Sequence, residues 1–166
     1  MKNTITIPES ELQQQIDLRN FYMGESAKRK DIDADTIQSC KDDKDLLHMF
    51  MHTACNALVT AVALRFPSIS YAIKKVEESD EDEKNIVFEF ETADDSRSHL
   101  LPNLQQAITD FIINEVLLQW LLVRRPEVAQ TYITQRADLY SNAVFMFAKM
   151  YNSKRRRRRA TDIAGI

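Results

Sequence analysis

Residues 100–125 read LLPNLQQAITDFIINEVLLQWLLVRR, and this stretch decides how the remainder of the chain is arranged. Between Phe111 and Val123 only Asn114, Glu115 and Gln119 are polar. A surface helix has one apolar stripe, whereas a helix that is apolar on almost every side is buried on several sides. The polar interruptions make it too short for a membrane span, which needs about 20 mostly apolar residues. We therefore predict a central helix covered by the other elements or by neighbouring subunits.

The length and composition favour one mainly helical domain. A chain of 166 residues is most simply one domain, which buries about 70% of its unfolded surface. Its two glycines and four prolines allow few tight turns, which favours long helices over many short strands. With Gly24 and Gly165 as the only glycines, neither a Walker A loop nor a dinucleotide-binding loop is possible.

Three further helices and two strands are expected around the central helix. The first helix begins at Pro8-Glu9-Ser10-Glu11 and weakens at Gly24, and a charged loop follows. The second helix runs from Asp45, its expected N-cap, to Phe66, where Pro67 ends it. For the central helix, Ser98 or Asn103 is the expected cap, and Pro126 is the expected first residue of the last helix.

The two strands are predicted from alternating apolar residues: Ile69, Tyr71 and Ile73, then Ile86, Phe88 and Phe90. The acidic connection EESDEDEK joins them into a hairpin, which must pack on the helices or pair with a strand of another chain. The predicted fold is therefore mainly α, a four-helix bundle-like domain with one β-hairpin between the second and third helices and a basic C-terminal tail. We divide the chain into an N-terminal arm at 1–8, a helical domain at 9–152 with the hairpin at about 69–92, and the tail at 153–166.

One helix face carries potential metal ligands. His48, His52 and Cys55 lie at i, i+4 and i+7, with Asp45 one turn earlier. The glutamate that follows the first histidine in zinc enzymes is replaced by Met49. No Cys-x-x-Cys motif or second histidine pair is present, and Cys40 could reach the face only across a loop. We interpret the face as a half-buried stripe, with an incidental metal site as the alternative. Without a catalytic motif, no enzyme activity, cofactor or metal is expected.

Positive charge is concentrated near the C-terminus. From Lys149 to Ile166 there are seven Lys or Arg and one Asp, a balance of +6, and because the total is −3 the preceding residues carry −9. The tail contains six successive cations, Lys154, Arg155, Arg156, Arg157, Arg158 and Arg159, followed by two spaced isoleucines, Ile163 and Ile166. Such a run binds either DNA phosphates or an acidic protein surface. It also suits a solvated helix end or a localisation signal, and the isoleucines suit a partner's groove.

Location is expected to be intracellular. MKNTITIPES has neither a charged n-region nor an apolar h-region, and Cys40 and Cys55 do not form a disulfide framework. We expect no membrane partner.

The segments LLPNLQQAITDFIINEVLLQWLLVRRP and YSNAVFMFAKMYNSKRRRRR resemble stretches of phage structural proteins from Bacteroidetes hosts. Over about residues 9–159 the order of elements is similar to that of the head-to-tail adaptor, or connector, proteins at the neck of tailed bacteriophages. The resemblance implies a helical bundle, a projecting hairpin and a C-terminal extension that reaches a neighbour. It also implies a non-enzymatic protein that forms a ring with portal and tail or neck proteins, in the virion and, during assembly, in the host cytoplasm. No signature motif carries over a functional residue.

A ring needs contact surfaces on each subunit. Residues of the central helix left uncovered would form an apolar patch of the kind that marks interfaces, and the candidates are Phe111, Trp120 and Leu121. The acidic hairpin tip, with Glu81 and Asp82, offers a charge opposite to that of the tail. Opposite charges at separate sites favour head-to-tail contacts, which close into rings. The alternative function is a small helical nucleic-acid-binding or regulatory protein that uses the arginine-rich tail.

Overall fold

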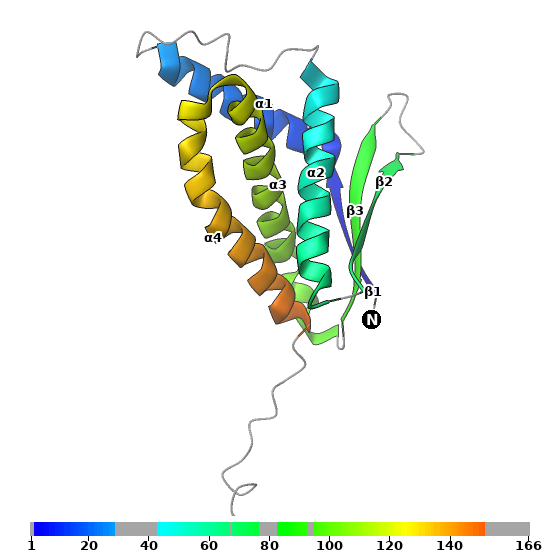
Figure 1. Cartoon of the computed structure of the whole chain (residues 1–166). Helices are drawn as coiled ribbons and strands as arrows, with labels where there is room; N and C mark the ends of the chain where they lie inside the picture. The colour runs from blue at the N-terminus through cyan, green and yellow to red at the C-terminus, as the bar shows by residue number, and fades with distance from the viewer. Residues whose placement is uncertain (1, 29–42, 67, 77–82, 93–94, 152–166) are drawn as a thin grey trace, which may run out of the picture.

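The computed structural model describes residues 2–28, 43–66, 68–76, 83–92 and 95–151. Within these ranges the chain forms four helices and a three-stranded sheet (Figure 1). In chain order the elements are β1 (Lys2–Pro8), α1 (Glu9–Lys28), α2 (Lys44–Ala63), β2 (Ser70–Lys75), β3 (Lys84–Glu91), the 3-10 helix η3 (Asp95–Leu100), α3 (Leu101–Arg124) and α4 (Pro126–Tyr151). The prediction of a mainly α fold is confirmed.

Helix α3 lies at the centre of the fold. All residues from Phe111 to Leu118 are buried, as are Trp120 and Leu121. Helices α1, α2 and α4 and strand β1 all pack against α3. A helix that is apolar all round thus finds cover on each side within one chain, and the prediction of a central helix is confirmed.

The sheet differs from the predicted hairpin because the N-terminal arm joins it. Strand β3 lies between β1 and β2, antiparallel to both, and Ile5 of β1 faces Phe88 of β3. Alternate residues of β1 are buried, with Ile5 and Ile7 on the same side as the core residues of β3. Since a two-stranded ribbon is marginally stable in water, a third strand with an apolar face stabilises it. The described part of the arm, Lys2–Pro8, is therefore an edge strand of the sheet.

Polar contacts hold β1 against the sheet. Asn3 is buried, and its Nδ2 donates a hydrogen bond of 2.8 Å to Oγ1 of Thr92. On the outer face, Glu89 of β3 lies between Lys2 at 2.8 Å and Lys74 at 3.1 Å. The hydrogen bonds from these two ammonium groups lower the pKa of the Glu89 carboxyl. Lysines on both edge strands also discourage pairing with strands of other molecules.

Several helix ends differ from the predictions. The N-cap of α2 is Asp43, without a side-chain capping bond, and Asp45 lies in the first turn. The Asp43 carboxylate instead accepts a hydrogen bond of 2.9 Å from Arg124. Helix α1 continues through Gly24, which is buried. The contact of Asp43 with Arg124 thus overrides the local capping preference of its side chain. Burial of Gly24 within α1 likewise overrides the tendency of glycine to end a helix.

The start of α3 also differs, and the start of α4 agrees. Helix α3 is capped by Leu100, at the end of η3, rather than by Ser98 or Asn103, and it has no side-chain capping bond. Helix α4 begins at Pro126 as predicted. A proline suits this position because the first helical residue has no intrahelical partner for its N–H.

Two helices are long and apolar enough to cross a membrane, Lys44–Ala63 and Ser98–Arg124. The expectation that the central stretch is too short therefore fails on length and composition. The apolar window of the second helix is 72% buried inside the fold, and the core helix of a soluble protein meets the same criteria. This is weak evidence for a membrane span, and the absence of a membrane partner stays a prediction.

The central position of α3 predicts a contrast between two of its leucines. Leu117 is fully buried, whereas Leu122 is 47% exposed. Leu117→Ala should lower the free energy of unfolding by about 2–5 kcal/mol because it leaves a cavity. Leu122→Ala should change it by less than about 0.5 kcal/mol. Urea denaturation followed by Trp120 fluorescence measures both, and equal losses would contradict the central role of α3.

Candidate docking groove between α2 and α4

Helix α4 is anchored at its two ends and stands away from the core in its middle. Two small residues near these ends, Ala129 and Ala143, are fully buried, and no residue of 130–142 is buried. Near the C-terminal end, Phe147 packs against Phe90 with ring centroids 5.5 Å apart. Figure 1 shows α4 crossing α3 obliquely, and the C-terminal end of α4 approaches α2. The middle of α4 is therefore covered only in part.

A groove of about 450 Å³ lies beneath the middle of α4. It is lined by residues of three helices: Ala57 of α2, Phe111 of α3, and Ile133, Arg136, Ala137 and Tyr140 of α4. All of these side chains except that of Arg136 are apolar or aromatic. The volume falls in the range of roughly 300–1,000 Å³ that is usual for ligand sites, which are mostly apolar with a few polar groups.

The single charged side chain of the groove is held by a buried partner. The Nε and Nη2 atoms of Arg136 donate to the two carboxylate oxygens of Glu115 at 2.7 and 2.9 Å. The Glu115 side chain is 6% exposed and that of Arg136 is 53% exposed. This two-pronged pairing fixes the guanidinium plane and places Nη1 outside the bonded pair. The groove thus combines an apolar lining with one oriented cation.

A second polar contact ties the same part of α4 to α3. The Asn114 Nδ2 donates to the backbone oxygen of Tyr132 at 3.3 Å. The Oδ1 of Asn114 is buried and has no hydrogen-bond partner among the described residues. The Tyr132 hydroxyl contacts the sulfur of Met23 at 3.2 Å, and burial raises its pKa. Polar links therefore replace close apolar packing where α4 stands over the groove.

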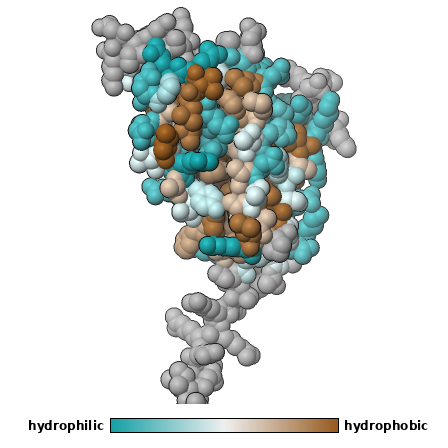
Figure 2. Space-filling view, in the orientation of Figure 1, coloured by the Kyte–Doolittle hydropathy of each residue, from teal (hydrophilic) through white to brown (hydrophobic). Residues whose placement is uncertain are grey.

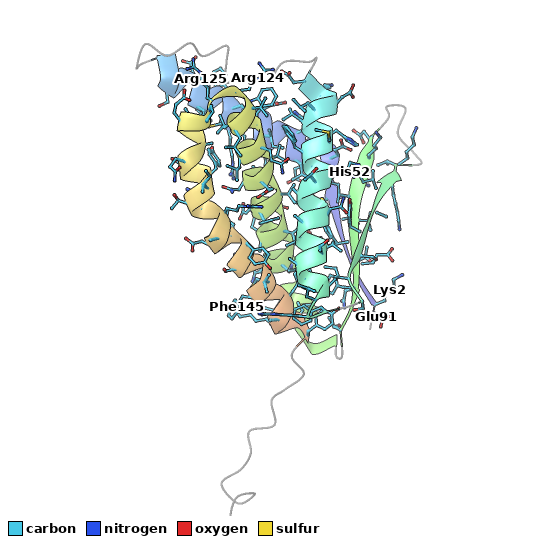
Figure 3. The ribbon with its side chains drawn as sticks, in the orientation of Figure 1. Lys2, His52, Glu91, Arg124, Arg125 and Phe145 are labelled. Carbon is cyan, nitrogen blue, oxygen red and sulfur yellow. The ribbon has the colours of Figure 1, made fainter. Side chains whose placement is uncertain are left out.

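Exposed apolar side chains occur in the groove and elsewhere on α3 and α4. Ile133 is 43% exposed and Tyr140 is 37% exposed. Figure 2 shows hydrophobic residues gathered near the α3–α4 turn and along the upper part of α4; Leu122 and Val123 are exposed in this part of the chain. Phe145, on the lower part of α4 (Figure 3), is also half exposed, and Lys149 lies over its ring at 4.4 Å. An apolar surface of this kind is typical of protein contact sites.

The histidine face lies elsewhere, between α2, α1 and the sheet. The Nε2 of His48 is 3.3 Å from Oε1 of Glu9, and the His48 and His52 rings are 4.7 Å apart. The His52 Nδ1 is 3.4 Å from the Tyr71 hydroxyl. Burial, and then the neighbouring His48, lower the pKa of His52. The His52 ring also packs edge-on against the rings of His48 and Tyr71.

Cys55, the third potential ligand, is a core residue. It is fully buried, and burial raises the pKa of its thiol to about 12. A thiol in this state is a poor nucleophile and a poor metal ligand, because both roles need the thiolate. No group of three or more His, Cys, Asp or Glu side chains in the described ranges is placed to hold a metal ion.

The structure corrects the candidate interface residues of α3. Trp120 and Leu121 are fully buried, so they form no exposed patch. Arg124 lies over the Trp120 ring at 4.6 Å. Phe111, 3% exposed, forms part of the groove floor. The remaining candidates lie outside the described residues: Glu81, Asp82, Lys154 to Arg159, Ile163 and Ile166.

The groove itself was missed in the sequence, although two residues signal it. Glu115 is the only charged residue between Phe111 and Val123, and Arg136 is the only cation between Pro126 and Phe147. A lone acid in an apolar helix needs a buried partner, and a lone cation on the next helix can supply it. The depth of the groove depends on the course of α4 over α3, which the spacing of apolar residues in the sequence does not define.

Comparisons with known proteins identify no relative: no family model, no curated protein and no solved structure matches the chain.

The pairing of Glu115 with Arg136 predicts that removing one partner destabilises the fold more than replacing both. Arg136→Met should lower the free energy of unfolding by about 1–3 kcal/mol, because the buried Glu115 loses its partner. Combining it with Glu115→Leu should restore most of that loss, since apolar residues often replace a buried pair without cost. Chemical denaturation of the single and double variants measures the coupling. Arg65→Met, at an exposed arginine, is the control and should be nearly neutral; a loss as large as that of Arg136→Met would contradict the special role of the pair.

Proposed function

We propose that the chain is a non-enzymatic structural protein of a tailed-phage virion, a head-to-tail adaptor that forms a ring at the neck below the portal. In this proposal it is a four-helix bundle-like domain with a β-hairpin between α2 and α3 and a basic C-terminal tail. The proposal is supported mainly by the groove between α2 and α4, which offers an apolar surface. Such a surface suits binding of another protein segment rather than catalysis.

The charge distribution also supports a contact between unlike surfaces. Residues 77–83 contain six acids, and residues 154–159 are six cations. When a contact joins two different surfaces of identical subunits, the subunit at each end of the chain of subunits still has one surface unoccupied. Further subunits can therefore add until a ring closes. Complementary charge orients such contacts and makes them sensitive to salt.

The adaptor proposal is tested with purified virions and with isolated portal particles. The protein should be present in purified virions of a phage that encodes it, in a fixed copy number per portal. Added to isolated portal particles, the full chain should assemble into a ring visible by electron microscopy, and the ring should weaken as salt rises. A chain that stays monomeric with portal particles and is missing from virions would refute the proposal.

A second candidate function is binding of nucleic acid through the run from Lys154 to Arg159. Neutralising about six phosphates would make log K fall with log salt at a slope of about −5. Replacing the five arginines by glutamine should abolish binding to duplex DNA without changing the helical circular dichroism signal. Salt-series fluorescence anisotropy measures the slope. A flat salt dependence would exclude the phosphate contacts and leave an acidic protein surface as the partner of the tail.

A further inference from the structure

Titratable side chains of four elements meet between α2 and the sheet. On α2 the His48 and His52 rings are 4.7 Å apart, and His48 Nε2 lies 3.3 Å from Oε1 of Glu9 at the start of α1. Tyr71 of β2 places its hydroxyl 3.4 Å from the Nδ1 of His52. Lys84, at the start of β3, acts electrostatically on His52. We call these five residues the histidine cluster.

The contact of His52 with Tyr71 helps to hold β2 on the helices. Strand β2 is an edge strand that pairs with β3 on one side, and among the helices it packs mainly on α2. The Tyr71 hydroxyl also donates to the backbone oxygen of His52 at 3.5 Å, and the two rings pack edge-on with centroids 6.3 Å apart. A change in the charge of His52 therefore acts directly on the attachment of this strand.

The histidine cluster is balanced in charge while both imidazoles are neutral. The Glu9 carboxylate and the Lys84 ammonium then oppose each other in their effect on His52. The Tyr71 hydroxyl and the nearby Cys55 thiol stay uncharged, because burial raises the pKa of each. Protonation of both histidines places two more cations side by side, so that three cations share one carboxylate. Like charges this close repel strongly where water is partly excluded.

The two histidines differ in what a proton meets. The Nε2 of His48 faces Glu9, and both this nitrogen and Oε2 of Glu9 are buried without a hydrogen-bond partner among the described residues. A proton on His48 is therefore placed beside a carboxylate. The described contacts of His52 include no carboxylate. Burial lowers the pKa of His52 most, His48 lowers it further, Glu9 opposes this effect and Lys84 adds to it.

We propose that the histidine cluster is a pH-dependent switch that controls the contact between α2 and β2. With both imidazoles neutral, His52 stays in contact with Tyr71, and β2 lies against α2. With both imidazoles protonated, repulsion between His48 and His52 loosens this contact, and the edge strand opens locally. The switch requires a single folded chain, so it is independent of the adaptor function and of any assembly.

The pH range of the switch follows from His52. Its pKa in the folded chain lies below the ordinary value of 6.5, so the closed state binds fewer protons than the open state. The closed state is therefore fully favoured above about pH 6.5, and it loses that advantage as the pH falls through the lower pKa of the folded chain. For one proton taken up on opening, each pH unit in this range changes the equilibrium by up to about tenfold.

Hydrogen exchange of the full chain at about pH 7.5 and about pH 5.5 tests the switch, because carboxyl groups of ordinary pKa stay ionised over this range. Rates are corrected for the intrinsic pH dependence of amide exchange. Protection of the amides of residues 70–75 should fall several-fold, up to about tenfold, at the lower pH. The amides of residues 112–118 in α3 should keep their protection. Equal protection of β2 at both pH values, or an equal loss in α3, would overturn the inference.

A matched pair of histidine variants shows whether His52 is responsible. His52→Gln removes the proton site but keeps a polar side chain near Tyr71, so the protection of β2 should become equal at the two pH values. His99 is the third histidine of the chain and is exposed. His99→Gln should therefore keep the loss of protection seen in the parent chain. A loss that persists in His52→Gln, or one that disappears in His99→Gln, contradicts the switch.

The pKa of His52, measured by NMR titration of its imidazole, is a readout that a purely structural role would not change. His48→Gln should raise this pKa because it removes a neighbouring cation, and Glu9→Gln should lower it because it removes a neighbouring anion. The pH at which β2 opens should move in the same two directions. A parent pKa at or above 6.5, or one that neither variant changes, overturns the proposal. Circular dichroism at about pH 7.5 confirms that both variants are folded.

Discussion

The fold depends on removing the whole circumference of α3 from water. Burying one large apolar side chain contributes about 1.5–3 kcal/mol, and α3 holds a continuous series of them between Phe111 and Leu121. A helix with a single apolar stripe could rest on one layer, but α3 needs cover on every side. Helices α1, α2 and α4 and the sheet meet this need together, so each of them is positioned by its contact with α3. The groove exists because α4 completes this cover mainly near its ends.

The two polar links between α3 and α4 define how the helices meet. The pairing of Glu115 with Arg136 and the hydrogen bond from Asn114 to the Tyr132 backbone lie one helical turn apart along α4. Apolar packing alone tolerates sliding of one helix past the other, whereas a shift that separated the buried Glu115 carboxylate from Arg136 would leave an uncompensated buried charge. We interpret these links as fixing the register of α4. With α4 held in this way, Ile133, Ala137 and Tyr140 line one side of the groove.

The spacing of apolar residues correctly predicted those helices and strands whose buried face follows from their own sequence. The uninterrupted apolar run of α3 and the alternation of Ile86, Phe88 and Phe90 both correspond to observed elements, as does the start of α4 at Pro126. The errors arise where distant contacts compete with local signals. Asp43 binds Arg124, at the far end of α3, and β1 finds its partner in β3. The groove was missed for the same reason, because a one-dimensional pattern gives the face of a helix but not its crossing angle with another.

The pairing of β1 with β3 has a consequence for biosynthesis. Asn3 and Thr92, which share a hydrogen bond, are 89 residues apart, and the central strand of the sheet is the last of the three to be translated. While the ribosome is still making α2, the first strand has no partner and its apolar alternate residues are in water. Closing so long a loop costs chain entropy before any contact compensates for it, which slows folding. Helix α1, which follows β1 directly, is therefore made early but can dock in its final place only after the sheet and α3 have emerged.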